Sequence, residues 1–229
     1  MNTQQNRLQG VKSRIALAAA AAGRDPRDIL LLAVSKTFPA ERIRTTFADG
    51  QTHFGENYLQ EAMEKMDGLA DLPITWHFIG PIQSNKTRLI AERFGWVHSI
   101  ERSKIAERLA AQRPLRLPPL QVCIQVNTSG EVSKSGCAPE EVMTLARAVA
   151  KMSNLQLRGL MTVPEPTNDL RLQRSRFESL AVLLQQCVTA GVPMDTLSMG
   201  MSMDLEQAIA AGATIVRIGT AIFGERAVT

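Results

Sequence analysis

The sequence predicts an α/β protein in which parallel strands close into a barrel. Short apolar runs typical of buried strands alternate with segments whose apolar residues recur at helical spacing, and eight such units follow one another. Strict alternation implies parallel strands joined by right-handed crossovers. Eight units in 229 residues approach the ~250 residues typical of a (β/α)8 TIM-type barrel. An open doubly wound sheet is the alternative.

The first half of the chain supplies an extra helix and four strand–helix units. The amphipathic helix over residues 1–23 buries Leu8, Val11 and Ile15 on one face and ends at Gly23. The predicted strands, each a short apolar run, lie at residues 30–36, 53–57, 74–79 and 96–100. Helices follow each strand, and we expect Ser84 to cap the one after the third strand.

The second half supplies four further units, with strands at residues 120–127, 155–163, 196–199 and 215–219. Pro139 opens one of the intervening helices, Gly191 closes a longer one, and Ser202 begins the last. No linker or low-complexity stretch divides the chain. We therefore expect one domain over residues 1–229, with the helix of residues 1–23 packed on the barrel.

Composition narrows the classes of function. Hydrophobic residues make up 45% and charged residues 21%, which is ordinary for a globular protein. The net charge of +4 suits an anionic small molecule as well as nucleic acid. The chain has seven Phe, two Trp and one Tyr, so stacking platforms for nucleic acid are scarce and we expect no nucleic-acid partner.

Cysteine usage and hydropathy predict the compartment. The three cysteines are scattered and form no C-x-x-C pair, which argues against a zinc ribbon or a redox dithiol and fits a reducing cytosol. The N-terminus has no apolar signal core, and no window of ~18 apolar residues occurs elsewhere. We expect a cytoplasmic protein with no membrane contact.

In such a barrel, function gathers at the carboxyl ends of the strands. Those ends are Lys36, Asn57, Gly80, Ser99, Asn127, Thr162, Ser198 and the pair at 219–220. They include one amine, two amides and several hydroxyls, but no Ser–His–Asp set and no carboxylate cluster. A lone lysine at this position suits an imine with a carbonyl compound, although a solvated surface lysine is the plainer interpretation.

Two further features point to an anion. Arg217 lies between Val216 and Ile218 in an apolar strand, so alternation turns it toward the barrel interior, where a guanidinium must be paired. A structural salt bridge and a ligand partner are both open. Glycine-containing runs at 198–202 and 219–224 follow strands seven and eight, where barrels of this kind hold phosphate. Together these features suggest a phosphorylated aldehyde held as an imine.

His53, His77 and His98 lie on different strands without metal-binding spacing, so we expect core or hydrogen-bonding roles and no metal site. Lys86 and Lys134 lie in predicted loops and are expected to be solvated, although either could help attract an anion.

Seven stretches resemble the pyridoxal phosphate homeostasis protein family, whose fold is similar to the N-terminal barrel of alanine racemase. They are AVSK at 33–36, FGENY at 54–58, WHFIGPIQSNK at 76–86, SKSG at 133–136, RGLM at 158–161, LSMGMS at 197–202 and VRIGTAIFG at 216–224. They occur in order over essentially the whole chain.

The resemblance implies that Lys36 forms an internal aldimine with pyridoxal 5'-phosphate. It implies that the phosphate is held by Ser198, Gly219, Thr220 and backbone amides of the turn that contains Gly200. Asn57 is expected near the ring, and Arg217 near the pyridine nitrogen or the phosphate, a choice left open. An arginine beside that nitrogen would disfavour its protonation and weaken the ring as an electron sink.

Racemases of the similar fold carry a second, β-rich domain and take one of two bases from a tyrosine of the partner subunit. The chain ends five residues after Gly224, and Tyr58 is its one tyrosine, so we expect neither a second domain nor a second base. The resemblance implies a vitamin B6 carrier without established turnover, a monomer or weak dimer that buffers pyridoxal phosphate or delivers it to apo-enzymes. The alternatives are a pyridoxal phosphate-dependent amino-acid racemase or lyase and, more remotely, an aldolase-type Schiff-base barrel.

Overall fold

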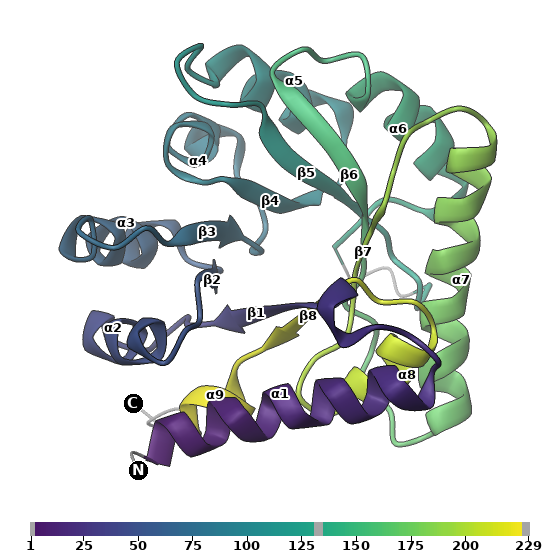
Figure 1. Cartoon of the computed structure of the whole chain (residues 1–229). Coiled ribbons are helices and arrows are strands. Elements are labelled where there is room, and N and C mark those ends of the chain that lie inside the picture. Colours follow the sequence, from purple (N-terminus) through teal and green to yellow (C-terminus); the bar gives the residue numbers. More distant parts are fainter. Residues whose placement is uncertain (1–2, 131–134, 226–229) are drawn as a thin grey trace.

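The computed structural model describes residues 3–130 and 135–225. Eight parallel strands pair in chain order and close on themselves, because β8 pairs with β1 (Figure 1). The strands are β1 (Leu30–Val34), β2 (His53–Glu56), β3 (Thr75–Phe78), β4 (Trp96–Ile100), β5 (Leu120–Gln125), β6 (Leu155–Met161), β7 (Thr196–Ser198) and β8 (Ile215–Ile218). The closed barrel is confirmed, and the open sheet is excluded.

Helices surround the barrel. They are α1 (Thr3–Ala21), α2 (Ala40–Ala48), α3 (Leu59–Gly68), α4 (Thr87–Arg93), α5 (Ser103–Gln112), α6 (Val142–Val149), α7 (Leu170–Thr189), α8 (Leu205–Ala210) and α9 (Thr220–Phe223). Three short 3-10 turns, η1 (Pro26–Asp28), η2 (Ser84–Lys86) and η3 (Pro139–Glu141), precede β1, α4 and α6. α1 packs beside α8 and α9 with Leu8, Val11 and Ile15 buried, as predicted (Figure 1). The short helix α9 was not predicted.

Element boundaries differ from the predicted ones at two kinds of position. Several strands end one or two residues before the predicted end, because the chain leaves the ladder there. Lys36 already lies in a turn and Asn57 in a bend, and the amide of Asn127 donates to the Cys137 carbonyl in the following loop. Ser84 does not cap a helix. It begins η2, and its carbonyl accepts a hydrogen bond from the Thr87 hydroxyl at 2.9 Å. α8 begins at Leu205 rather than at Ser202.

Polar side chains run through the barrel interior. The hydroxyl of Ser198 on β7 lies 2.8 Å from a ring nitrogen of His98 on β4. Because β4 and β7 are not neighbours in the barrel, this hydrogen bond crosses the interior. His77, His98, Ser198 and Arg217 are all buried there. The apolar core lies largely between the strands and the surrounding helices. There, for example, the rings of Phe78 on β3 and Phe94 after α4 meet edge to face, with centroids 5.3 Å apart.

Gly80 allows a close approach that fixes the end of β2. A Cβ atom at Gly80 would lie 2.2 Å from the carbonyl oxygen of Asn57, so no larger residue fits without moving the backbone. The chain after β3 is thereby packed against the residue that follows β2. No helix of the described residues is long and apolar enough to cross a bilayer.

Candidate functional site

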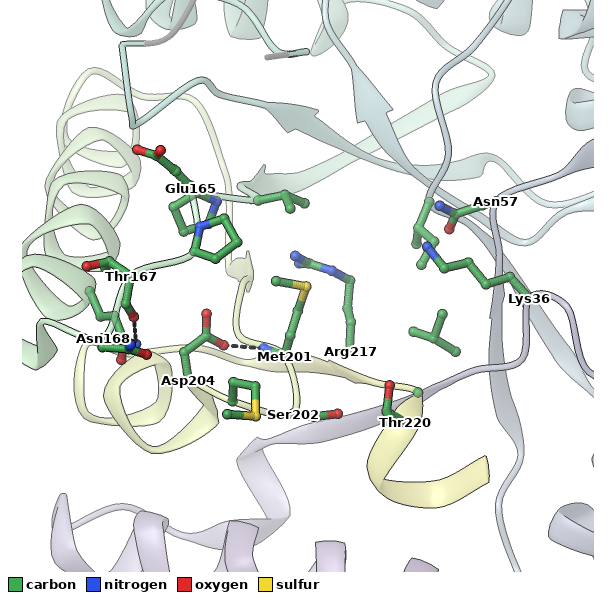
Figure 2. A pocket seen from close by; sticks show the side chains of 18 residues that line it. Lys36, Asn57, Glu165, Thr167, Asn168, Met201, Ser202, Asp204, Arg217 and Thr220 are labelled. Atoms are coloured by element: carbon green, nitrogen blue, oxygen red, sulfur yellow. Dashed lines mark hydrogen bonds between the residues drawn. The ribbon is translucent and has the colours of Figure 1, made fainter. Parts of the chain in front are cut away.

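A cavity of about 650 Å³ opens at the carboxyl ends of the strands. Lys36 and Asn57, which follow β1 and β2, form one side (Figure 2). The segment of residues 163–168 between β6 and α7 forms the opposite wall, and the turn of residues 201–204 borders the base (Figure 2). Arg217 extends into the space between these walls (Figure 2).

The structure brings most of the predicted ligand-binding residues together. Lys36, Asn57, Arg217, Gly219 and Thr220 all line the cavity. They come from β1, β2 and β8, which are consecutive strands of the closed barrel. Their contacts with a ligand stay predictions, but their common position at one cavity is a property of the fold.

Ser198 and Gly200 do not line this cavity. Ser198 is fully buried, and its hydroxyl lies between His98 and Arg217. Gly200 has φ +93°, and a Cβ atom there would lie 2.6 Å from that of Ala208, so packing of α8 accounts for the glycine. The amide of Met201 in the same turn already donates to Asp204 Oδ1 at 2.5 Å.

Arg217 is the buried cation of the site. Its side chain is 4% exposed, and its guanidinium donates from Nη1 to Ser198 Oγ at 2.9 Å and from Nη2 to the Thr162 carbonyl at 2.8 Å. Both acceptors are neutral, and no carboxylate of the described residues forms a salt bridge with it. Asp204 in the cavity wall acts on Arg217 only through its charge, which raises the pKa of Arg217 and opposes the effect of burial. Burial lowers the pKa of Arg217 to about 10, so the group is still charged at neutral pH. The interior charge therefore favours an anionic ligand.

Two buried acceptors in the cavity wall have no hydrogen-bond partner among the described residues. They are Asn57 Oδ1 and Gln173 Oε1. Leaving such atoms unsatisfied is unfavourable by about 1–3 kcal/mol each. The wall thus combines an amine, a guanidinium and two acceptors without donors, together with the carboxylates of Glu165 and Asp204. The amine, the guanidinium and the acceptors suit a ligand that carries an aldehyde, an anionic group and a hydrogen-bond donor.

The turn that carries Lys36 is fixed on both sides by α3. Thr37 has φ +69°, which is strained for a β-branched residue, and its amide donates to Glu61 Oε1 at 2.6 Å. Lys65 Nζ donates to the Ser35 carbonyl at 2.8 Å. Both neighbours of Lys36 in the chain are therefore held by side chains of one helix.

A buried ion-pair cluster holds these contacts together. Lys65 Nζ lies 2.8 Å from Glu56 Oε1 and 2.5 Å from Glu61 Oε1, and the Ser35 hydroxyl donates to Glu56 Oε1 at 2.6 Å. Burial raises the pKa of Glu56, and Lys65 acts in the opposite direction. This cluster was not predicted from the sequence. The available signals were the Glu61–Lys65 spacing of four residues on a helix and an acidic residue at the end of an apolar strand.

The three histidines form a row of hydrogen bonds. His53 Nδ1 lies 2.9 Å from His77 Nε2, and His77 Nδ1 lies 2.9 Å from His98 Nε2. Burial lowers the pKa of His77 well below its ordinary value, and burial together with the charge of Arg217 lowers that of His98 to about 3. At neutral pH these two buried rings are uncharged, and the predicted hydrogen-bonding role is confirmed.

Of the two lysines predicted to lie in loops, the structure describes Lys86, which does not line the cavity. Lys86 ends η2 and is exposed, as predicted. Lys134 lies outside the described residues.

Comparison with known proteins identifies the family. The family described as "Alanine racemase, N-terminal domain" matches residues 7–227. The pyridoxal phosphate homeostasis protein of Pseudomonas aeruginosa is 60% identical over 226 residues, which cover 99% of this chain and 97% of that protein. The protein of the same name from Escherichia coli K12 is 51% identical and covers 99% and 98%. The chain belongs to the pyridoxal phosphate homeostasis protein family.

Solved structures of related proteins share the barrel. PipY of Synechococcus elongatus, solved with PLP bound, superposes with a TM-score of 0.80 at 35% identity, covering 92% of this chain and all of that one. Alanine racemase of Corynebacterium glutamicum superposes with a TM-score of 0.69 at 18% identity, covering 95% of this chain and 62% of that one. The second likeness establishes the fold alone.

The depressed pKa of His98 predicts acid sensitivity for this family member. From the ordinary value of 6.5 down to about 3, the unfolded state takes up a proton that the folded state does not. The contribution of neutral His98 is therefore present above pH 6.5 and is lost as the pH falls through that window. In most of the window its share of the unfolding free energy falls by about 1.4 kcal/mol per pH unit.

Urea unfolding between pH 7 and 4, compared with His98→Asn, measures this share, because carboxylates contribute to both proteins. The variant should lose stability less steeply as the pH falls. Parallel pH profiles would contradict the assignment.

The ion-pair cluster predicts a large effect of Lys65→Met. Removing the ammonium group leaves Glu56 buried without its cation, so the free energy of unfolding should fall by about 3–5 kcal/mol. Adding Glu56→Gln to this variant should restore part of the loss, because the amide carries no charge. Urea unfolding of the wild type, both single variants and the double variant measures the coupling; additive losses would show that the two side chains act independently.

Proposed function

We propose that this protein binds pyridoxal 5'-phosphate in the cavity between Lys36 and Arg217 and serves vitamin B6 homeostasis as a carrier without turnover. The observation that carries the proposal is the presence in one cavity of a lysine amine and a buried arginine that forms no salt bridge with a carboxylate of the described residues. Relatives named for pyridoxal phosphate homeostasis and the PLP-bound structure of PipY support it.

The residues of the cavity fit the groups of this molecule. The Lys36 amine, when neutral, attacks the aldehyde carbon; a carbon–nitrogen double bond forms and the carbonyl oxygen leaves as water, so the capture is reversible. Ser202, Gly219 and Thr220 lie together at the carboxyl ends of β7 and β8 and are suited to the phosphate. Asn57 supplies a buried acceptor beside Lys36.

The proposed lack of turnover is supported by the residues around Lys36. A racemase needs a second base on the face opposite the lysine. Of the described residues, neither a histidine nor a tyrosine lines the cavity. Tyr58 is 54% exposed and is not among the cavity residues. Two carboxylates, Glu165 and Asp204, do line the cavity. A site that captures an aldehyde reversibly, without a histidine or tyrosine base, is suited to buffering it or passing it to apo-enzymes.

The proposal predicts a yellow protein whose colour depends on Lys36. With pyridoxal phosphate added, the wild type should show visible absorbance, and borohydride reduction should leave a pyridoxyl adduct on the peptide that contains Lys36. Lys36→Ala should lose both. Lys104→Ala, which changes an exposed lysine of α5, is the matched control and should keep both.

Two results would count against the carrier. A wild-type protein that takes up no pyridoxal phosphate would refute the binding proposal. Racemisation or decarboxylation of a common amino acid that disappears in Lys36→Ala would favour the racemase or lyase alternative.

Arg217→Gln should weaken retention of pyridoxal phosphate about tenfold, because a neutral amide replaces a buried charge-assisted donor. The barrel should remain folded, since the amide can still donate to one of the neutral oxygens that hold Arg217. Equilibrium dialysis gives the affinity and circular dichroism the fold. Unchanged affinity in a folded variant would make Arg217 a purely structural residue.

A further inference from the structure

The three histidines of this sequence all belong to one row of hydrogen bonds across the barrel. The row begins at His53, which borders a hollow of about 340 Å³ at the amino ends of β1, β2 and β8. It continues through His77 and His98 to Ser198, and Arg217 donates to Ser198 from the other side. The row therefore connects the amino-terminal face of the barrel with the arginine of the ligand cavity.

Arg217 determines the direction of every proton in the row. Its guanidinium is always a donor, so Ser198 Oγ accepts the hydrogen bond of 2.9 Å. The Ser198 hydroxyl is fully buried, and its other partner among the described residues is His98 Nδ1 at 2.8 Å. The hydroxyl proton can be satisfied only by pointing at that nitrogen, so His98 Nδ1 is an acceptor.

The same reasoning passes down the row. A neutral imidazole that accepts at Nδ1 carries its proton on Nε2. His98 then donates from Nε2 to His77 Nδ1, and His77 donates from Nε2 to His53 Nδ1. All three rings are Nε2–H tautomers, and every donor in the row points away from the ligand cavity.

Filling space does not explain this arrangement. A buried imidazole is unfavourable unless both of its nitrogens are bonded, and apolar side chains of similar size would fill the interior without that requirement. Each buried ring here has both nitrogens bonded, and the ring of His77 is stacked on Trp96 with centroids 5.3 Å apart. The row ends on a charged group that lines the cavity.

We propose that this row is a polarised hydrogen-bond relay that positions Arg217 for the ligand, with Ser198 and His98 as positioning residues. Ser198 presents a lone pair to Arg217 because its proton is held by His98. The Ser198 hydroxyl and the Thr162 carbonyl together fix two of the five N–H groups of the guanidinium. The other N–H groups remain to bind a ligand in the cavity. The effect on pyridoxal phosphate rests on the proposed function; the polarity of the row does not.

Nitrogen NMR of ¹⁵N-histidine-labelled protein without ligand tests the polarity. The wild type should show single Nε2–H tautomers for His77 and His98. In Arg217→Met the donor that sets the direction is gone, and His77, which does not contact residue 217, should show mixed tautomers. Ser198→Ala, a smaller change that removes the link itself, should have the same effect and serves if the first variant does not fold.

Affinity for pyridoxal phosphate tests the positioning. Ser198→Ala should bind about tenfold more weakly, as expected for a disturbed hydrogen bond to a charged group. Thr87→Val is the matched control, because the buried Thr87 hydroxyl also accepts from an arginine, Arg108, and donates to a carbonyl, but lies away from the cavity. Its affinity should stay within about twofold of the wild type.

The outcomes separate the two proposals. An Nδ1–H tautomer at His77 in the wild type, or a tautomer unaffected by both variants, would overturn the relay. Equal affinities of Ser198→Ala and Thr87→Val would overturn the positioning role. A wild type that binds no pyridoxal phosphate would refute the proposed function instead, and the NMR result would still decide the polarity.

Discussion

The charge of Arg217 inside the barrel is the constraint on which the site depends. A guanidinium removed from water needs acceptors, and the fold supplies Ser198 and the Thr162 carbonyl rather than a carboxylate. A carboxylate bonded to the guanidinium would neutralise the arginine and remove its attraction for an anion, whereas Asp204 in the cavity wall forms no salt bridge with it. Neutral acceptors hold the group in place and leave its charge directed at the cavity. The low pKa of His98 is partly a consequence, since a second positive charge beside Arg217 is unfavourable.

The chain around both cationic residues of the cavity is ordered by specific contacts. Arg217 is fixed directly, because its guanidinium donates hydrogen bonds to Ser198 and to the Thr162 carbonyl. Lys36 is fixed through its backbone neighbours, because Lys65 and Glu61 of α3 hold residues 35 and 37. An ordered backbone on both sides of Lys36 fixes the position from which its nucleophilic side chain reaches into the cavity. The strained φ of Thr37 is tolerated because Glu61 binds its amide.

Most of the fold and part of the site could be predicted from the sequence. Strand–helix alternation gave the barrel, and the ends of its strands gave Lys36 and Asn57, because parallel strands bring their carboxyl ends to one face. Alternation within β8 turned Arg217 inward. The partners of Arg217 and the cluster around Lys65 could not be predicted in this way, since they depend on which interior side chains meet across non-adjacent strands or between a helix and a turn. The sequence pattern also placed Gly200 in the ligand-binding turn. In the structure its close contact is with Ala208 of α8.

The histidine row also constrains how this sequence can change. Each buried ring satisfies its neighbour, so replacing one of them by an apolar residue leaves an unpaired polar nitrogen on another strand. A second replacement removes that unpaired group and is therefore less harmful after the first than before it. The residues at positions 53, 77 and 98 are consequently bound by mutational epistasis. Exchanging all three as a set for apolar residues leaves one group unpaired, the Ser198 hydroxyl, although the three histidines are separated by more than twenty residues at each step.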